Sequence, residues 1–161
     1  EEITEEYFTC AFGEDWQQFH DYLRELGEAF NYYYLEGQYS ADMERSPYYN
    51  PAHAESLGKV KTITQKGREL IKAHYNMPYR TQTVSVRLLE MHAKYADLLA
   101  DALIPKCQGD DDEADRMFAV MKAEVGKEEV YFQTCYDHGL AFHCLVSIFN
   151  SKTKTAEAMI Y

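Results

Sequence analysis

The sequence predicts an all-α fold, and three observations support that prediction. Apolar residues recur at steps of three and four along nearly every segment, as they do on the buried face of a helix. Only 4 prolines and 8 glycines interrupt the chain, which favours long helices over many short strands. A length of 161 residues is enough for one domain with a sizeable core. We expect four long helices with a short N-terminal helix in front of them, arranged as an up-and-down bundle or as an elongated helical array.

The first two helices precede a long loop. A short helix is expected over residues 1–12, and Gly13 ends it. The second helix is expected over residues 14–36, with Gly37 as its C-terminal cap because glycine tolerates a positive φ. Residues 37–50 show no clear period and are expected to form a loop. A loop this long is unusual in a helical domain and is often functional or in contact with another molecule.

The next two helices carry clear boundary signals. Asn50 can cap the free N–H groups of the third helix, and Pro51 suits a first helical position, where its missing N–H costs nothing. Pro78 lies beyond the end of this helix. The fourth helix is expected over residues 79–104, with Pro105 as its stop. Its two overlapping apolar stripes imply neighbours on more than one side, so it is the expected central helix.

The fifth helix is expected to begin at Asp110, which forms a capping-box pattern with Glu113. Its apolar pattern continues to about residue 150, with Gly126 and Gly139 as weak points. The remaining residues are expected to form an extended C-terminal tail.

These boundaries give the expected domain organisation. Residues 1–13 are the end of an upstream domain or a lead-in helix, residues 14–150 form the helical domain, and residues 151–161 are the C-terminal tail. No internal repeat is visible.

The charge of the chain excludes some classes of partner. The net charge is -11, and a polyanion repels phosphate backbones, so we expect no nucleic-acid binding. Anionic membrane surfaces are disfavoured for the same reason. No apolar run approaches the ~20 residues that would span a bilayer, so we expect no membrane partner.

The cysteines and histidines do not have the spacing of a metal site. No CxxC pair is present, and no two Glu-x-x-His pairs of a di-metal bundle occur. We therefore predict no metal and no cofactor. The four cysteines are expected to be free thiols, which favours a reducing, cytoplasmic compartment. These cysteines and the six histidines are Cys10, Cys107, Cys135, Cys144, His20, His53, His74, His92, His138 and His143.

No catalytic motif is recognisable. The chain has neither a glycine-rich phosphate loop nor a nucleophile elbow, and no catalytic pair can be chosen by spacing among its 27 acidic residues. We therefore predict no catalytic residues and no enzyme activity for this chain alone.

The tyrosines are the one feature of the sequence that indicates a candidate binding site. Tyrosine has an apolar ring and a polar tip, which suits a half-wet contact surface. One interpretation is that the rings seal the loop against the end of the bundle. The other, which we adopt as the hypothesis, is that they form a surface for a partner domain or a sugar. The residues assigned to this surface are Tyr33, Tyr39, Tyr48 and Tyr49.

The order of the elements resembles a known family. ITEEYFTCAFGEDWQQFHDYL resembles the segment that closes the TIM barrel of certain glycoside-hydrolase-like proteins. RLLEMHAKYADLLADAL, CQGDDDEADRMFAVMKAEV and YFQTCYDHGLAFHCL are similar to the helical C-terminal domain of the same proteins. These largely uncharacterised proteins are related to α-glucuronidases and β-N-acetylhexosaminidases. The matching residues are Phe8, Ala11, Phe12, Gly13, Gly109, Asp110, Ala114, Tyr136 and Asp137.

The resemblance covers nearly the whole chain and implies that this chain has a non-catalytic role. The catalytic barrel would lie upstream in the same polypeptide, and this chain would be an accessory domain packed on it, with loops that could border the sugar cleft. No catalytic residue of the family maps to this sequence. The alternative is a free-standing helical module for protein binding or oligomerisation.

Overall fold

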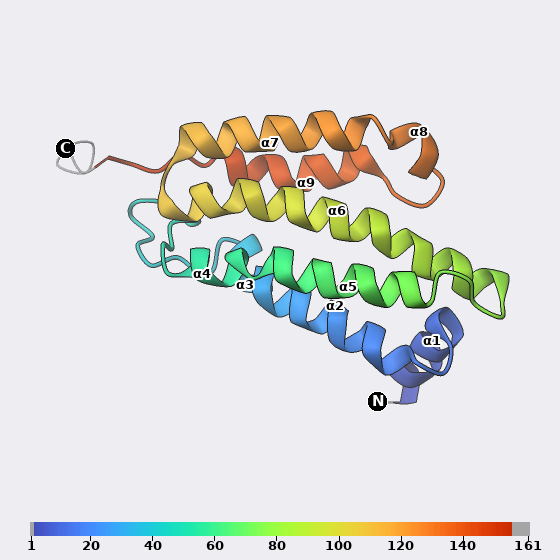
Figure 1. Cartoon of the computed structure of the whole chain (residues 1–161). Helices are drawn as coiled ribbons and strands as arrows, with labels where there is room; N and C mark the ends of the chain where they lie inside the picture. Colours follow the sequence, from blue (N-terminus) through green and yellow to red (C-terminus); the bar gives the residue numbers. More distant parts are fainter. Residues whose placement is uncertain (1, 156–161) are drawn as a thin grey trace. The chain divides into compact units, whose positions relative to one another are not determined.

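The computed structural model describes residues 2–155 and confirms the all-α fold, with helices and no strand in that range (Figure 1). The predicted tail therefore lies partly outside the described residues. Residues 151–155 are not helical, as expected. The helices are α1 Glu2–Phe12, α2 Trp16–Phe30, α3 Tyr32–Leu35, α4 His53–Gly58, α5 Val60–Ala73, α6 Arg80–Gln108, α7 Asp111–Gly126, α8 Glu129–Phe132 and α9 His138–Asn150.

The chain divides into two compact units. The first unit contains residues up to Ala29 and residues 59–97, and the second contains residues 30–58 and the chain from Leu98 onward. Helix α6 contributes its first part to the first unit and its last part to the second. The domain boundaries expected after residues 13 and 150 stay predictions.

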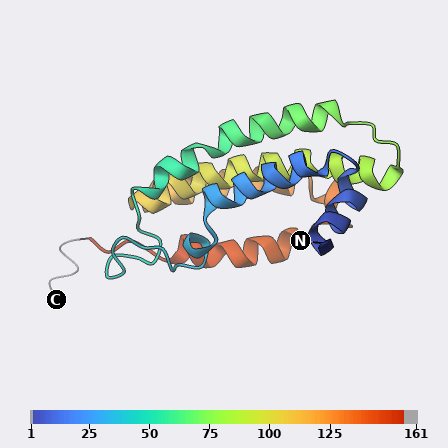
Figure 2. The ribbon, with the colours of Figure 1, turned by 90° about the horizontal axis from the view of Figure 1, so that it is seen from below.

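The first unit has an aromatic and aliphatic core. Phe12 of α1 stacks on Phe19 of α2, with their ring centroids 4.7 Å apart. Ile71 of α5 and Val86 and Leu89 of α6 complete this cluster. Helix α1 folds back against the beginning of α2 (Figure 2). The apolar residues that recur at helical spacing in α1, α2, α5 and α6 therefore meet in one core.

A charged cluster lies between α5 and α6 in the first unit. The Arg68 guanidinium donates to the Asp97 carboxylate at 2.8 Å and to Glu90 at 3.2 Å. Thr64 donates to the same Asp97 carboxylate at 2.5 Å. These groups come from different helices, so sequence spacing within one helix does not reveal the cluster.

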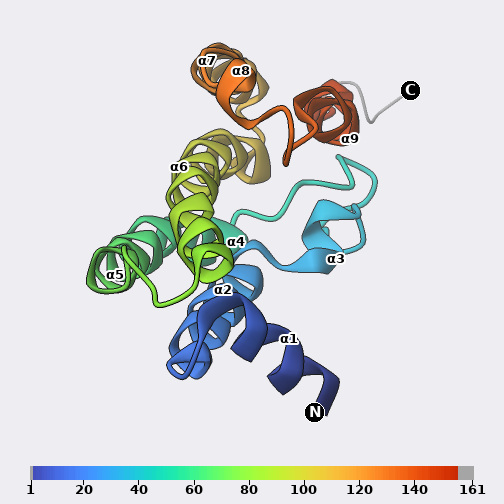
Figure 3. The ribbon, with the colours of Figure 1, turned by 90° about the vertical axis from the view of Figure 1, so that its right-hand side faces the viewer.

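The core of the second unit lies between α7 and α9, which run side by side (Figure 3). Phe118 of α7 stacks on Phe149 of α9, with centroids 4.0 Å apart. Met121 and Val125 of α7 and Ile148 of α9 are also buried. Both helices therefore contribute apolar residues to the core of this unit.

The predicted second helix is wrong in one respect, because Asn31 splits it into α2 and α3. Its φ of 56° lies in the left-handed region, which a helix cannot continue through. Its side chain accepts a hydrogen bond from the Tyr33 N–H at 3.0 Å and so caps α3. Gly37 ends α3 with a φ of 69°, and its role as the C-terminal cap is confirmed.

The predicted third helix begins at His53 and is interrupted at Lys59, which separates α4 from α5. The backbone of Lys59 stays in the right-handed helical region, so the interruption is slight. The Asn50 side chain donates to the Tyr39 carbonyl at 2.9 Å and thereby holds the loop that precedes α4.

The prediction that Pro105 stops the fourth helix is wrong. Helix α6 continues to Gln108, because a proline in the last turn removes one N–H bond without preventing one further turn. The helix ends at Gly109, whose φ is 86°. The N–H groups of Gly109 and Asp110 return to the carbonyls of Lys106 and Pro105, which is a Schellman motif.

The predicted fifth helix is three helices. Asp110 caps α7 as expected, by accepting from the Glu113 N–H at 3.1 Å. Gly126 ends α7, but Gly139 lies inside α9, so only the first predicted weak point is a break. Asp137 starts α9 by accepting from the Leu140 N–H at 2.8 Å.

Candidate functional site

The tyrosines assigned to a contact surface all lie in the second unit, but they differ in exposure. Tyr33 is 61% exposed and Tyr39 is 47% exposed. Tyr49 is half-buried, and Tyr48 is only 8% exposed. Two of the four predicted residues are therefore exposed to solvent.

The loop that carries these residues is held by its own hydrogen bonds. The Ser40 hydroxyl lies 2.7 Å from the Ser46 carbonyl oxygen and 3.1 Å from that of Tyr49. The Ala41 N–H donates to the same Tyr49 carbonyl at 2.7 Å. The Asn50 N–H donates to the Cys107 carbonyl of α6 at 2.8 Å. The loop is thus fixed in one shape and tied to the end of α6.

Tyr48 belongs to the interior of the second unit, which corrects its predicted place on a surface. Its carbonyl accepts from the Tyr34 hydroxyl at 3.1 Å, and Tyr34 is fully buried. Burial raises the pKa of the Tyr48 hydroxyl, and a hydrogen bond with the Ser147 side chain opposes that rise. The ring packs close to Gly37 at the end of α3, where an added Cβ would lie 3.4 Å from the Tyr48 Cζ atom.

A histidine missed by the sequence reasoning supports the same interior. His53 is buried, and its Nε2 lies 3.2 Å from the Phe30 carbonyl oxygen, to which it donates. Its ring contacts Tyr34 at 4.5 Å and Tyr39 at 5.8 Å. Burial lowers the pKa of His53, although the bond to Phe30 opposes this effect. The neutral ring of His53 therefore lies in an edge-to-face contact with Tyr39.

The Tyr49 ring is in contact with the positively charged side chain of Arg45. The Arg45 guanidinium carbon lies 3.8 Å above the Tyr49 ring centroid, a cation–π contact. The ring also packs close to Gly109, where an added Cβ would come within 3.2 Å of it. Tyr49 thus contacts both the loop and the end of α6.

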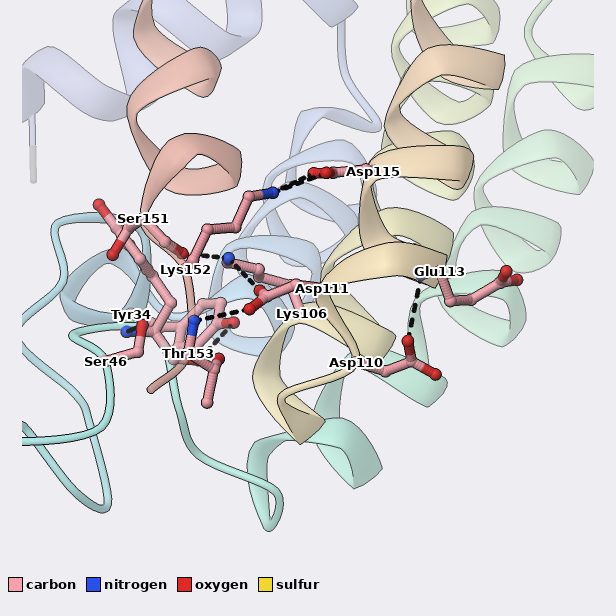
Figure 4. A network of polar contacts seen from close by, with 11 residues as sticks. Tyr34, Ser46, Lys106, Asp110, Asp111, Glu113, Asp115, Ser151, Lys152 and Thr153 are labelled. Carbon is pink, nitrogen blue, oxygen red and sulfur yellow. Dashed lines mark hydrogen bonds and ion pairs between the residues drawn. The ribbon is translucent and has the colours of Figure 1, made fainter. Parts of the chain in front are cut away.

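A buried lysine links the C-terminal segment to this end of the unit (Figure 4). Lys106 is 1% exposed, and its Nζ donates to the Asp111 carboxylate at 2.6 Å. The same ammonium also donates to the Ser151 carbonyl. The second oxygen of Asp111 accepts from the Thr153 N–H at 2.6 Å. We call Lys106, Asp111, Ser151 and Thr153 the C-terminal clamp.

The C-terminal clamp stabilises the ionised form of Asp111 in the folded protein. Burial raises the pKa of Asp111, but hydrogen bonds from Lys106 and the Thr153 N–H outweigh it, and the pKa is lowered. A second ion pair joins Lys152 to Asp115 of α7 at 2.6 Å and is half-exposed. The Lys154 N–H donates to the Arg45 carbonyl at 3.0 Å. The C-terminal segment therefore connects α6, α7 and the tyrosine-bearing loop.

The described part of the chain holds no group of three side chains placed to bind a metal ion. Between residues 2 and 155 all four cysteines are free thiols; Cys107 is buried, and the other three are exposed. No helix among the described residues is both long and apolar enough to cross a membrane.

Comparisons with known proteins give no relative: no family model, curated protein or solved structure matches this chain.

Proposed function

We propose that this chain is a non-catalytic helical accessory module of a larger carbohydrate-active protein. In this proposal Tyr33 and Tyr39 dock on the catalytic barrel that the family resemblance implies. The chain would act by holding that barrel, and not by chemistry of its own. The sugar cleft would then lie on the partner, near the edge of this contact.

One observation carries the proposal: two exposed tyrosine rings stand on a segment whose backbone is already fixed. Tyr33 follows the Asn31 cap, and Tyr39 rests on His53. A surface ordered before binding loses less conformational entropy on association. Tyrosine also keeps its hydroxyl hydrogen-bonded at a wet interface rim, which suits a contact between two domains.

The test is binding in trans between this chain and the separately produced upstream domain. Replacing Tyr33 and Tyr39 together by serine should raise the dissociation constant at least tenfold, about 1.4 kcal/mol. Tyr7 and Tyr79 are exposed tyrosines of the first unit, and their double serine variant is the matched control. Isothermal titration calorimetry measures both.

Two outcomes would contradict the proposal. One is the absence of binding between the unaltered chain and the upstream domain. The other is an equal loss of affinity in both double variants, since the effect would then be general to exposed tyrosines.

A further inference from the structure

The segment from Val130 to Ser151 is nearly free of charge, although 27% of the chain is charged. Its one charged residue is Asp137, and that carboxylate is occupied as the cap of α9. Glu129 and Lys152 bound the segment on either side. Neutrality over this length, in a chain with a net charge of -11, calls for a physical reason.

Helix α9 has one face in the core and one in solvent. Ile148 and Phe149 are buried against the second unit. On the other side Leu140 is 59% exposed, and His143 and Cys144 are also exposed. A helix without charge on any side is normally covered on all sides, whereas a surface helix has a charged outer face. The outer face of α9 therefore has the composition of a contact surface.

The loop covers only the C-terminal end of this face. Ser147 hydrogen-bonds with Tyr48, so the last turn of α9 is occupied within the unit. Leu140, His143 and Cys144 lie on the turns before it, where their exposure leaves room for a partner. We call these three residues the α9 face.

We propose that the α9 face binds a second copy of this chain, with the two α9 helices antiparallel. In a two-fold interface the same patch meets itself, so each charge near the axis would face its own like charge. A patch without charge avoids this repulsion when a strongly acidic chain pairs with itself. The α9 face meets that condition, with Leu140 of one copy opposite Cys144 of the other.

The size of the face sets the expected affinity. Residues 138–146 of α9 precede its last turn and span about 14 Å. A helix pair of that length buries well under the roughly 800 Å² per partner of a standard interface. The dimer is therefore weak, with a dissociation constant in the micromolar range or above. Because salt screens the repulsion between the two acidic copies, the dimer is more stable at high salt.

The first experiment is sedimentation equilibrium over a wide concentration range in high salt. The unaltered chain should show a reversible monomer–dimer equilibrium. Leu140→Glu should raise the dissociation constant at least tenfold. Val84→Glu introduces the same charge at an exposed valine of α6 in the first unit and should leave the dissociation constant unchanged. A chain that stays monomeric up to millimolar concentration overturns the proposal and leaves the α9 face to a different partner.

The second experiment traps the pair through its thiols with a short bismaleimide crosslinker. Three variants each keep one exposed cysteine, Cys10, Cys135 or Cys144, with buried Cys107 retained throughout. Only the Cys144 variant should give a crosslinked dimer in high yield, and Leu140→Glu should abolish it. Equal yields from all three variants would indicate random collision and refute the α9 arrangement.

Discussion

Replacing Lys106 by methionine tests how the C-terminal clamp stabilises the second unit. Methionine keeps most of the apolar stem but removes the ammonium. The variant leaves Asp111, whose side chain is 17% exposed, without its ion-pair partner, and the Ser151 carbonyl without its donor. Breaking a buried ion pair by removing one partner costs about 3–5 kcal/mol. The Thr153 N–H and the α7 N-terminus still stabilise the Asp111 charge, so we expect a loss of about 3 kcal/mol.

The assay is urea unfolding followed by far-UV circular dichroism, with Trp16 fluorescence as a second probe of two-state behaviour. Lys152→Met is the matched control, because it removes the same group from a half-exposed ion pair. Exposed pairs contribute about 0–1 kcal/mol, so this variant should unfold nearly as the unaltered chain does. If Lys106→Met costs no more than Lys152→Met, the argument from burial is wrong.

A double variant separates the charge from the packing. Lys106→Met combined with Asp111→Leu removes both charges and should recover most of the lost stability, because two apolar groups leave no uncompensated charge.

The stability that Asp111 contributes depends on pH with a defined sign. The pKa of Asp111 is lower in the folded state, so its contribution is present above the unfolded pKa of about 3.9 and is lost as pH falls through the folded pKa. The difference between the unaltered chain and Lys106→Met should therefore shrink in acid.

Two further predictions concern packing. An alanine Cβ at Gly67 would lie 2.3 Å from the Tyr22 ring, so Gly67→Ala should destabilise the fold by about 1–3 kcal/mol. At Gly27 of α2 an added Cβ meets nothing within 4 Å, so Gly27→Ala should stabilise the fold by about 0.5–1 kcal/mol. Thermal melts of the two variants should shift in opposite directions, and a shift in the same direction would contradict the steric argument. Tyr48→Ser should cost more than about 2 kcal/mol because its ring is buried, while Tyr33→Ser should cost less than about 0.5 kcal/mol. Equal losses in urea unfolding would show that the two rings are equally important to the core.

Periodicity predicts most of the helical content because amphipathic stripes depend only on local sequence. Breaks are harder to predict, since they depend on one backbone angle. Nothing beside Asn31 marks it as the residue that turns left-handed, and Pro105 carries a stop signal that the last turn of α6 tolerates. Gly13 and Gly37 are predicted correctly because glycine is the usual residue at a positive φ.

The candidate site is less predictable because it depends on contacts distant in sequence. Three consecutive tyrosines require at least one outward ring; Tyr32 and Tyr33 are exposed and Tyr34 is buried. Which of the loop tyrosines turns inward is decided by the path of the loop. Lysine is rarely fully buried, and Ser151 lies 45 residues beyond Lys106, so no local pattern indicates their contact.

The C-terminal clamp also changes where this module ends. Apolar periodicity alone would place the last residue at Asn150, and the residues after it would look dispensable. Cutting there would take away the Ser151 carbonyl and the Thr153 N–H together, so the buried Lys106–Asp111 pair would lose both of its backbone partners in the clamp. A fragment that keeps all these contacts reaches at least Lys154, whose N–H bonds to the Arg45 carbonyl. Any protein fused downstream needs its linker to begin after that point.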